Sequence, residues 1–572
     1  MKNRIKQYLL AASMCVGLTA CSDFFEPIPG VQFGLDETFA SKQRTEEYLN
    51  NVYSYVREVT DAIHPNTYGG IFTEASLDGA NRWNKTYAEW TNGSFNSASA
   101  QASEYFSKYY QAIAKASTFI QNVDKCTEAA ASTRGKWKSE ARALRAYYYF
   151  ELLRLYGPIP LIGEDPIPLD ASLEELIKER NSVDECVNFI ATELQSAIDS
   201  GDLLQRAGKA NLGRMDVATC MALKAKLYLY WASPLFNGNT DQASVKNKDG
   251  KQLFPQTEDN SKWAQARDAY ERFMTFATGQ GYKLTEVYTN GKLDPYASCR
   301  AAGEFFTTTW EAVDELIFVK LRDLYDYTYW VCPKFTDFQD TDVTGGGGYY
   351  TTQETVDLFF TKDGLTIEED PGYDKFEGIP SANNFTSGRY YDPNNPSRLY
   401  FDADKSKVLK QWKDREPRFY VNITYSGSIW LNEGKYNEEM RTDFTNGANG
   451  TCGKSKASGD CPDSGYLIRR GAKASNNNGS KHFSPVLRLA DMYLGYAEAL
   501  CMCSDLDNAL TYLNKIRVRA GIPEYTFTAT AGKITCPKTQ TDLLNRIRRE
   551  RLVELVFEWN RYFDVRRWKV AE

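Results

Sequence analysis

Segments in which apolar residues recur every three or four positions constrain this chain most, because that spacing lines one face of an α-helix. The clearest segment contains Trp137, Ala141, Leu144, Tyr148 and Leu152, and the turn at 157–160 ends it with glycine and two prolines. The same spacing occurs in 211–232, in 485–503, in 505–520 and from about 542 to 560. The sequence therefore predicts a mainly α-helical protein.

Alanine and glycine are interspersed with large aromatic residues in these segments, as in the stretch from Ala141 to Tyr149. Small residues packed against large ones are typical of tetratricopeptide-like helix pairs. We expect four pairs: 41–58 with 103–126, 136–156 with 183–200, 211–232 with 261–279, and 485–503 with 505–520. No strict repeat of about 34 residues is present. The predicted fold is therefore a degenerate tetratricopeptide-like helical repeat scaffold.

Residues 280–480 have a different composition, rich in Gly, Asn, Asp, Ser and Tyr, with an unbroken run from Gly345 to Gly348. Long helical stripes are absent from this stretch, and irregular segments of such length commonly carry function. We predict a large loop-rich lobe inserted between an N-terminal helical region, 37–279, and a C-terminal helical region, 481–572, that completes the scaffold.

The amino terminus has the pattern of a lipoprotein signal peptide over residues 1–20. Lysine and arginine residues begin it, and an apolar run from Tyr8 to Leu18 follows that is too short to span a bilayer. The residues Leu18-Thr19-Ala20-Cys21 resemble a lipobox, in which cleavage precedes a cysteine that is then lipidated. We expect lipidation of Cys21 and a tether over 21–36 that contains two prolines. Asp23 and Glu26 resemble the surface-export signal of Gram-negative lipoproteins, a resemblance that implies an outer-membrane protein that faces the exterior.

The composition limits the kind of ligand and the kind of chemistry. A net charge of -7 argues against nucleic acid as a partner, because phosphate binding requires a basic surface. Only 2 histidines are present, which disfavours histidine-rich metal sites and histidine-dependent triads, so no metal or cofactor is expected. The 37 tyrosines and 11 tryptophans suit sugar ligands, since their rings have apolar faces and polar edges. A helical core built on tyrosine is the alternative explanation.

Four blocks of sequence resemble segments of the SusD/RagB family, and they occur along the chain in the same order as in that family. They are Arg142–Phe150 continuing through Leu155–Pro160, Val486–Leu494, Leu513–Gly521, and Arg549–Leu555 continuing through Arg561–Trp568. The resemblance implies a non-enzymatic outer-membrane lipoprotein that captures oligosaccharide or polysaccharide. It also implies delivery of this glycan to a SusC-like TonB-dependent transporter.

Three glutamates in the last block, Glu550, Glu554 and Glu558, are spaced to share one helical face. A carboxylate ladder of this kind either binds metal or forms part of a salt-bridged scaffold. Arginines at 549, 551, 561, 566 and 567 provide nearby countercharge, and no histidine joins the ladder. We therefore favour the salt-bridged scaffold.

The resemblance further implies an arc of aromatic side chains on the face turned toward the transporter. The segment 76–84 combines the residue types that bind sugars and resembles a loop that supplies part of this arc in the family. Its candidate ligand contacts are Asp78, Asn81, Arg82 and Trp83, with Trp90 farther along. The alternative is a helix-capping loop in which Trp83 fills the edge of the core.

A second group of candidates comes from the lobe: Tyr296, Cys299, Tyr327, Tyr329, Trp330, Arg389 and Tyr391. The alternation of aromatic residues over 325–330 is also compatible with a strand that buries one face. Tyr296 and Cys299 are predicted to lie in a loop close to this cluster.

Two other functions remain open from the sequence. An oligopeptide-binding lid of a RagAB-like importer would share the scaffold but would present a groove with backbone donors. A surface glycosidase would require two carboxylates at a fixed separation in a cleft, and no motif identifies such a pair.

Overall fold

The computed structural model describes residues 34–56, 71–76, 78–82, 93–165, 167, 171–303, 314–322, 325–335, 345–376, 378–430, 440–445, 452–453, 459–472 and 482–571. These residues form 17 α-helices, short 3-10 turns and small β-sheets, which confirms the prediction of a mainly helical protein. None of the described helices has both the length and the hydrophobicity that crossing a membrane requires.

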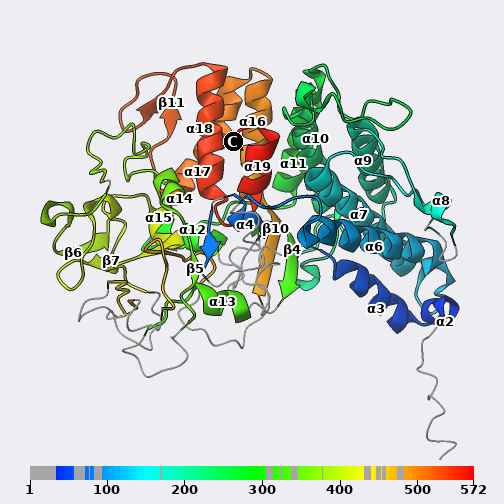
Figure 1. Cartoon of the computed structure of the whole chain (residues 1–572), viewed down its shortest axis with the longest axis horizontal. Helices are drawn as coiled ribbons and strands as arrows, with labels where there is room; N and C mark the ends of the chain where they lie inside the picture. Colours follow the sequence, from blue (N-terminus) through cyan, green and yellow to red (C-terminus); the bar gives the residue numbers. More distant parts are fainter. Residues whose placement is uncertain are drawn as a thin grey trace, which may run out of the picture.

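The N-terminal helices stack side by side at the right of Figure 1. They are α2 (Leu35–Ala40), α3 (Lys42–Tyr53), α6 (Ala100–Asn122), α7 (Ala131–Tyr156), α9 (Val183–Asp199), α10 (Val217–Ala232) and α11 (Ser261–Gly279), with the short α8 (Leu173–Leu176). The short α4 (Ile71–Glu74) lies at the centre of the view and contacts α19 (Asn560–Arg567). Helix α3 packs against α6, α7 against α9, and α10 against α11, so these three predicted pairs are confirmed.

Helix α10 begins later than the predicted start at residue 211. Gly213 has a left-handed backbone with φ of 89°, which a continuous helix does not accommodate. The helix begins only after Asp216, whose carboxylate accepts a hydrogen bond from the backbone N–H of Thr219 at 2.7 Å.

The C-terminal helices lie at the centre of the molecule (Figure 1): α16 (Leu489–Met502), α17 (Leu506–Ala520), α18 (Gln540–Glu554) and α19 (Asn560–Arg567). Helix α16 packs against α17, as predicted, and also against α11 and α18, which joins the two helical regions. The prediction of one helix from 542 to 560 is wrong. Phe557 and Trp559 adopt left-handed backbone conformations, with φ of 61° and 64°, and this break separates α18 from α19.

The lobe consists of short elements, as its composition indicates. Its helices are α12 (Pro295–Gly303), α13 (Tyr325–Val331), α14 (Gln353–Leu358) and α15 (Pro417–Asn422). Helix α13 shows that the strand alternative for 325–330 is wrong. Strand β4 (Leu316–Arg322) pairs antiparallel with β10 (His482–Arg488), so residues 485–488 are strand rather than the predicted helix.

A four-stranded sheet connects distant parts of the chain. Its order is β1 (Ala80–Asn81), β5 (Tyr349–Tyr350), β9 (Tyr466–Ile468) and β8 (Ile423–Tyr425). Two-stranded pairs complete the fold: β6 (Arg389–Asp392) with β7 (Asn395–Asp402), β2 (Tyr288–Thr289) with β3 (Lys292–Leu293), and β11 (Tyr525–Thr526) with β12 (Ile534–Thr535).

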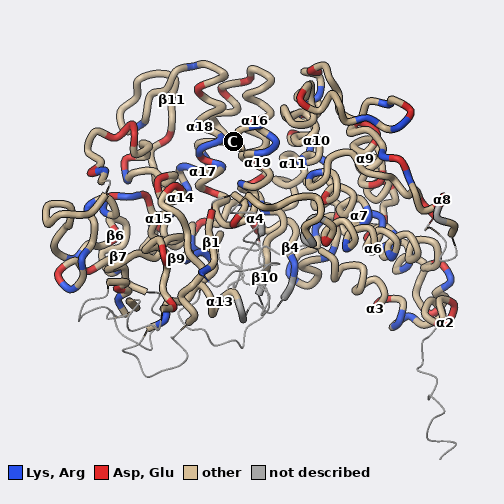
Figure 2. Tube along the Cα trace, in the orientation of Figure 1, with Lys and Arg blue, Asp and Glu red and all other residues tan. Residues whose placement is uncertain are grey.

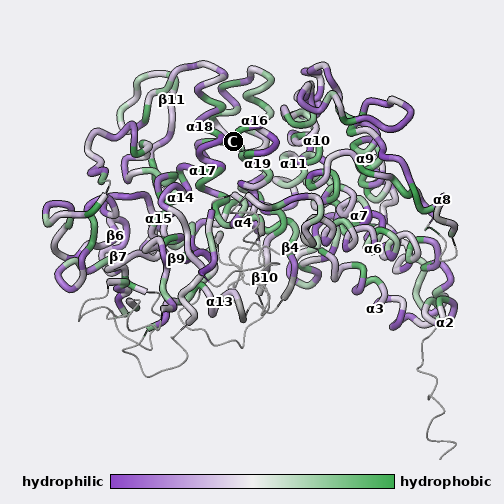
Figure 3. The backbone as a smooth tube through the Cα atoms, in the orientation of Figure 1, coloured by the Kyte–Doolittle hydropathy of each residue, from purple (hydrophilic) through white to green (hydrophobic). Residues whose placement is uncertain are grey.

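The distribution of polarity follows this architecture. Acidic and basic residues are interspersed along the same helices and loops of the described chain (Figure 2). Hydrophobic residues recur along α9, α10 and α16, while the outer loops are largely hydrophilic (Figure 3). Many core residues are tyrosines, among them Tyr109, Tyr147, Tyr148 and Tyr270, each 1% exposed or less. Part of the tyrosine excess therefore serves the core.

The packing of α16 on α11 depends on Gly495, because a Cβ atom there would lie 2.7 Å from the Cζ atom of Tyr270. Tyr270 is fully buried and has little room to move. We expect Gly495→Ala to lower the free energy of unfolding by about 1–3 kcal/mol through overpacking, measured by urea denaturation. Gly279→Ala, at a helix end with no atom within 4 Å, is the matched control and should be nearly neutral. A neutral Gly495→Ala would contradict this packing.

Candidate functional site

Strand β1 fixes the candidate loop at 78–82 against the lobe. Ala80 and Asn81 pair antiparallel with Tyr350 and Tyr349 of β5. A Cβ atom at Gly79 would lie 2.8 Å from the carbonyl oxygen of Tyr350, so the close approach of the two strands requires glycine there. The loop therefore has a defined position on the edge of the four-stranded sheet.

The backbone of the glycine run, residues 345–348, packs against α13 and forms hydrogen bonds with it. The backbone N–H of Gly346 donates to the carbonyl oxygen of Tyr329 at 2.7 Å, and that of Gly348 donates to the carbonyl oxygen of Trp330 at 3.3 Å. A Cβ atom at Gly346 would lie 2.5 Å from Cε3 of Trp330. Side chains in this run would therefore displace the indole ring.

Arg82 lies at the same place, because its backbone N–H donates to the carbonyl oxygen of Gly348 at 3.0 Å. The structure thus brings Arg82 together with Tyr329 and Trp330, which are distant in sequence. The rings of Tyr329 and Trp330 meet edge to face, with centroids 5.0 Å apart. All three side chains are half-buried, so each keeps part of its surface accessible. We call Arg82, Tyr329 and Trp330 the aromatic surface.

Two carboxylates in the segment 459–472 form ion pairs with basic side chains at or near the aromatic surface. The guanidinium of Arg82 forms an ion pair with Asp463 and donates to the carbonyl oxygen of Cys461 at 3.3 Å. Lys334, which follows α13, forms an ion pair with Asp460. The surface therefore has balanced charge and offers donors and acceptors beside two aromatic rings.

Asp78 points into the protein and has no exposed surface. Its Oδ1 accepts a hydrogen bond from Nη1 of Arg561 at 3.2 Å, and its carbonyl oxygen accepts one from the Thr351 hydroxyl at 2.5 Å. Burial raises the pKa of Asp78 to about 6, although Arg561 acts in the opposite direction. Asp78 therefore fixes the loop to α19 and to Thr351, which precedes α14.

This raised pKa predicts a pH dependence of stability. A folded pKa of about 6, above the ordinary 3.8, means that the folded state binds the proton more tightly. The contribution of Asp78 is therefore largest below pH 4 and declines as pH rises toward 6. Relative to Asp78→Asn, wild-type stability should increase by about 1–3 kcal/mol when pH falls from 7 to 4, measured by urea denaturation. A constant difference between the two proteins would show that the Asp78 pKa is not raised.

Tyr327 is also buried, and its hydroxyl donates to the carbonyl oxygen of Arg470 at 2.6 Å. It therefore connects α13 to the ionic cluster below. Asn81 is 8% exposed and faces the same side of the sheet as Tyr349. Within the loop and helix, Arg82, Tyr329 and Trp330 are the candidates with more exposed side chains.

Tyr296 and Cys299 lie on α12 rather than in a loop. Both are nearly buried, at 6% and 5% exposed. The Arg398 guanidinium lies 4.3 Å from the ring centroid of Tyr296, and burial raises the pKa of the Cys299 thiol to about 12. These two residues line the interior of the lobe.

Arg389 and Tyr391 lie on β6, at the outer left edge of the view, whereas α13 lies at the lower centre (Figure 1). The Arg389 guanidinium is 5.6 Å from the ring centroid of Tyr391, which is 36% exposed. They form a separate exposed pair. Trp83, Trp90 and Cys21 lie outside the described residues.

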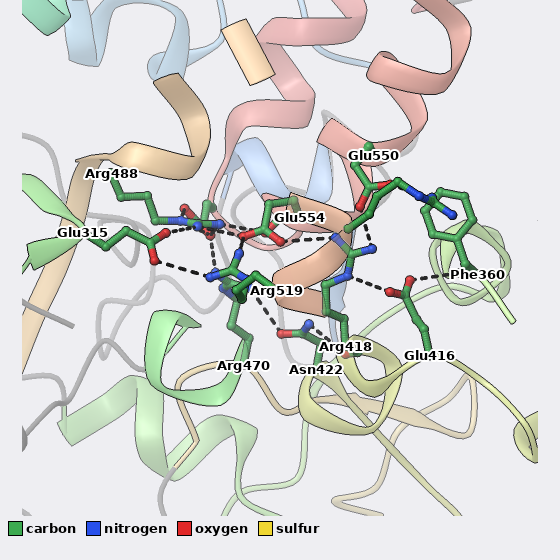
Figure 4. Close-up of polar contacts among 12 residues, drawn as sticks. Glu315, Phe360, Glu416, Arg418, Asn422, Arg470, Arg488, Arg519, Glu550 and Glu554 are labelled. Atoms are coloured by element: carbon green, nitrogen blue, oxygen red, sulfur yellow. Dashed lines mark hydrogen bonds and ion pairs between the residues drawn. The ribbon is translucent and has the colours of Figure 1, made fainter. Parts of the chain in front are cut away.

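A buried ionic cluster supports α12, α15 and α18 (Figure 4). It contains as many carboxylates as guanidinium groups: Glu315, Glu416, Glu550, Glu554 and Glu558 with Arg418, Arg470, Arg488, Arg517 and Arg519. Glu554 is the central acceptor, with Nη1 of Arg488 at 2.8 Å and Nη1 of Arg418 at 3.2 Å. The prediction of a salt-bridged scaffold is confirmed. No set of His, Cys, Asp and Glu able to hold a metal occurs among the described residues.

The predicted countercharges of these glutamates are wrong. Arg551 pairs with Asp491 and Asp564, Arg567 pairs with Glu498 and Asp564, and Arg561 pairs with Asp78 and Glu354. Arg549 and Arg566 donate to backbone carbonyl oxygens. The helix break at 555–559 is the reason for the later residues, because it places Glu558 and the arginines at 561, 566 and 567 outside the helical register of α18. Arg549 and Arg551 lie within α18 but have the other partners named above.

Two features that hold the aromatic surface in place were not predicted as part of the site. They are the glycine run, which packs against Trp330, and Asp463, which forms an ion pair with Arg82. Four consecutive glycines were a usable signal, since such a run allows backbone to approach an aromatic ring closely. Nothing in the sequence identified Asp463 as the partner of Arg82.

Two family models match the chain. One is described as "SusD family" and matches residues 315–572, and the other, described as "Starch-binding associating with outer membrane", matches residues 32–229. A SusD-like protein of Bacteroides ovatus is 27% identical over 175 residues, which cover 29% of this chain and only 30% of that relative.

Solved structures have the same fold. The protein BT4246 is 25% identical, with a TM-score of 0.71, and the match covers 93% of this chain and 89% of that one. A SusD-like carbohydrate binding protein from Bacteroides fragilis is 19% identical, with a TM-score of 0.61, and the match covers 93% and 87% of the two chains. One family model covers most of the N-terminal helical region, and the other covers most of the lobe and the whole C-terminal helical region, so the chain is identified as SusD-like.

Proposed function

We propose that this protein captures oligosaccharide or polysaccharide at the cell surface and delivers it to a SusC-like TonB-dependent transporter. The observation that carries the proposal is that the glycine run holds Arg82 close to Tyr329 and Trp330. A sugar ring has apolar C–H faces that pack on an indole or phenol ring, and hydroxyl groups that accept hydrogen bonds from a guanidinium. Trp83 and Trp90 lie outside the described residues and stay candidates on the basis of the sequence alone.

The comparisons support the same class of ligand. The model that matches residues 32–229 is described as starch-binding, and the Bacteroides fragilis relative is described as carbohydrate binding. Glycan-binding proteins of the SusD family are non-catalytic, so this protein is not an enzyme. Several weak contacts of about 1 kcal/mol each would act together in capture.

The proposal places the protein on the exterior of the outer membrane through lipidated Cys21. Residues 21–36 would act as the tether, although α2 already begins at Leu35. The packed helix pairs support a degenerate tetratricopeptide-like scaffold over 37–279 and 481–572, with 280–480 as the lobe that presents the ligand surface.

The experiment is native gel electrophoresis of the lipid-free chain, from Ser22 onward, in gels that contain laminarin, amylopectin, inulin or polygalacturonate. Retardation by a glycan, with no reducing ends released from it, is the expected result. Release of reducing ends would indicate a glycosidase. Absence of retardation, together with calorimetric binding of oligopeptides, would replace glycan capture with peptide capture.

A further inference from the structure

A cavity of 540 Å³ lies in the lobe and is separate from the residues of the aromatic surface. Its lining comes from β9, the start of α14 and the segment 409–412. None of the described residues that line it carries a charge, although charged residues make up 25% of the chain. A neighbouring pocket in the lobe is different, since Lys362, Asp374 and Lys410 contribute to its lining. The described lining of this cavity is therefore uncharged, unlike that of its neighbour.

The aromatic wall of this cavity is fixed by a chain of hydrogen bonds. Nε1 of Trp412 donates to the hydroxyl of Tyr466 at 2.9 Å, and that hydroxyl donates to Oε1 of Gln353 at 2.7 Å. The Trp412 ring also packs at 4.9 Å, between centroids, from Tyr425 in the core. Because these groups hold the rings in one orientation, little side-chain entropy would be lost when a ligand packs against them.

One polar side chain that lines the cavity forms no hydrogen bond among the described residues. Gln411 lines the cavity and is only 6% exposed, yet its side-chain amide forms no hydrogen bond with any described residue. Neither atom of this amide is among the fully buried polar atoms that lack a partner, so the amide remains accessible to solvent in the cavity. A hydroxyl-bearing ligand in the cavity would satisfy both the donor and the acceptor of this amide.

The remaining lining completes a site suited to a sugar. Phe376 and Phe444 are half-buried and add apolar surface, while Ser464 adds a hydroxyl at an exposed position. Ser464 directly follows Asp463, the ion-pair partner of Arg82, so the cavity and the aromatic surface share one segment of chain. The cavity also has the volume of a small-molecule site, typically about 300–1,000 Å³.

We infer that this cavity is a second binding site, for an uncharged sugar residue of the captured glycan, in which Gln411 binds sugar hydroxyls beside the Trp412 and Tyr466 rings. This inference rests on the proposed function and deepens it. The site would favour neutral glycans over acidic ones, because a carboxylate there would be desolvated without a countercharge.

Calorimetric titration of the lipid-free chain with laminarin, amylopectin and inulin, and with polygalacturonate as the acidic probe, tests the inference. Gln411→Leu keeps the size of the side chain but removes its amide, and we expect about threefold to tenfold weaker binding of the neutral glycan that wild type binds. Ser464→Trp, at an exposed position, should also weaken binding because it fills the cavity. Gln280→Leu, at the end of α11, is the matched control and should bind as wild type does.

The results of these titrations distinguish failure of the proposed glycan capture from failure of the second binding site. If wild type binds no glycan, the proposed function fails and the inference fails with it. If wild type binds a neutral glycan and both Gln411→Leu and Ser464→Trp bind it equally well, only the second site is overturned. Polygalacturonate binding that Gln411→Leu weakens as strongly as neutral binding would overturn the assignment to an uncharged sugar. Thermal denaturation of each variant monitors the fold, and Ser464→Trp keeps the test valid should Gln411→Leu not fold.

Discussion

Glu554→Gln is expected to lower the free energy of unfolding by about 3–5 kcal/mol, the effect of removing one partner from a buried ion pair. Glu554 is 3% exposed and lies among Arg418, Arg488 and Arg519. Glutamine keeps the shape of the side chain but not its charge, so the cluster would retain an uncompensated buried positive charge. Burial alone raises the pKa of Glu554, but these arginines more than offset it and hold the pKa well below its usual range.

Urea denaturation at pH 7 measures this loss. Glu271→Gln, on the exposed side of α11, is the matched control and should change stability by less than about 0.5 kcal/mol. A loss below about 1 kcal/mol for Glu554→Gln would show that the arginines do not depend on this carboxylate. The variant protein, if folded, should retain glycan binding, because the cluster supports the aromatic surface from below without forming part of it.

Trp330→Ala is expected to weaken glycan binding at least tenfold, which corresponds to about 1.4 kcal/mol. The indole ring of Trp330 is half-buried and packs against Gly346 of the glycine run. Removing it takes away the surface on which a sugar ring would pack. Because Trp330 is only half-buried, the fold should survive the change.

Calorimetry with the glycan retained in native gels measures this effect, and circular dichroism verifies the fold. Tyr288→Ala removes an aromatic side chain that is 61% exposed on β2, outside the aromatic surface, and should bind as wild type does. Equal glycan affinity of Trp330→Ala and wild type would show that Trp330 is not part of the ligand site. Arg389 and Tyr391 would then be the next candidates.

The helices were predictable because their signals are local. The helix predicted at 261–279 matches α11, and α17 ends at Ala520 as predicted, where Gly521 follows in a left-handed conformation. The helix pairs followed from small residues facing large ones. Local patterns failed where the backbone turns without glycine, as at Phe557 and Trp559, since no sequence signal marks a left-handed aromatic residue.

The candidate site was predictable only in part, because it depends on contacts between distant segments. Arg82 and Trp330 were each selected by residue type, but the sequence could not show that a glycine run brings them together. It also could not show that Asp78 is buried against Arg561, because aspartate in a loop is commonly solvated. Gln411 and Trp412 gave no signal, since a cavity is formed by tertiary packing alone.

A crystal structure of the lipid-free chain, from Ser22 onward, with an oligosaccharide of the retained glycan is the most direct test of glycan capture. We predict a sugar ring packed on Trp330, with a hydroxyl group within hydrogen-bond distance of the Arg82 guanidinium and all glycosidic bonds intact. Oligosaccharide bound only elsewhere on the molecule, or cleaved in the crystal, would contradict it.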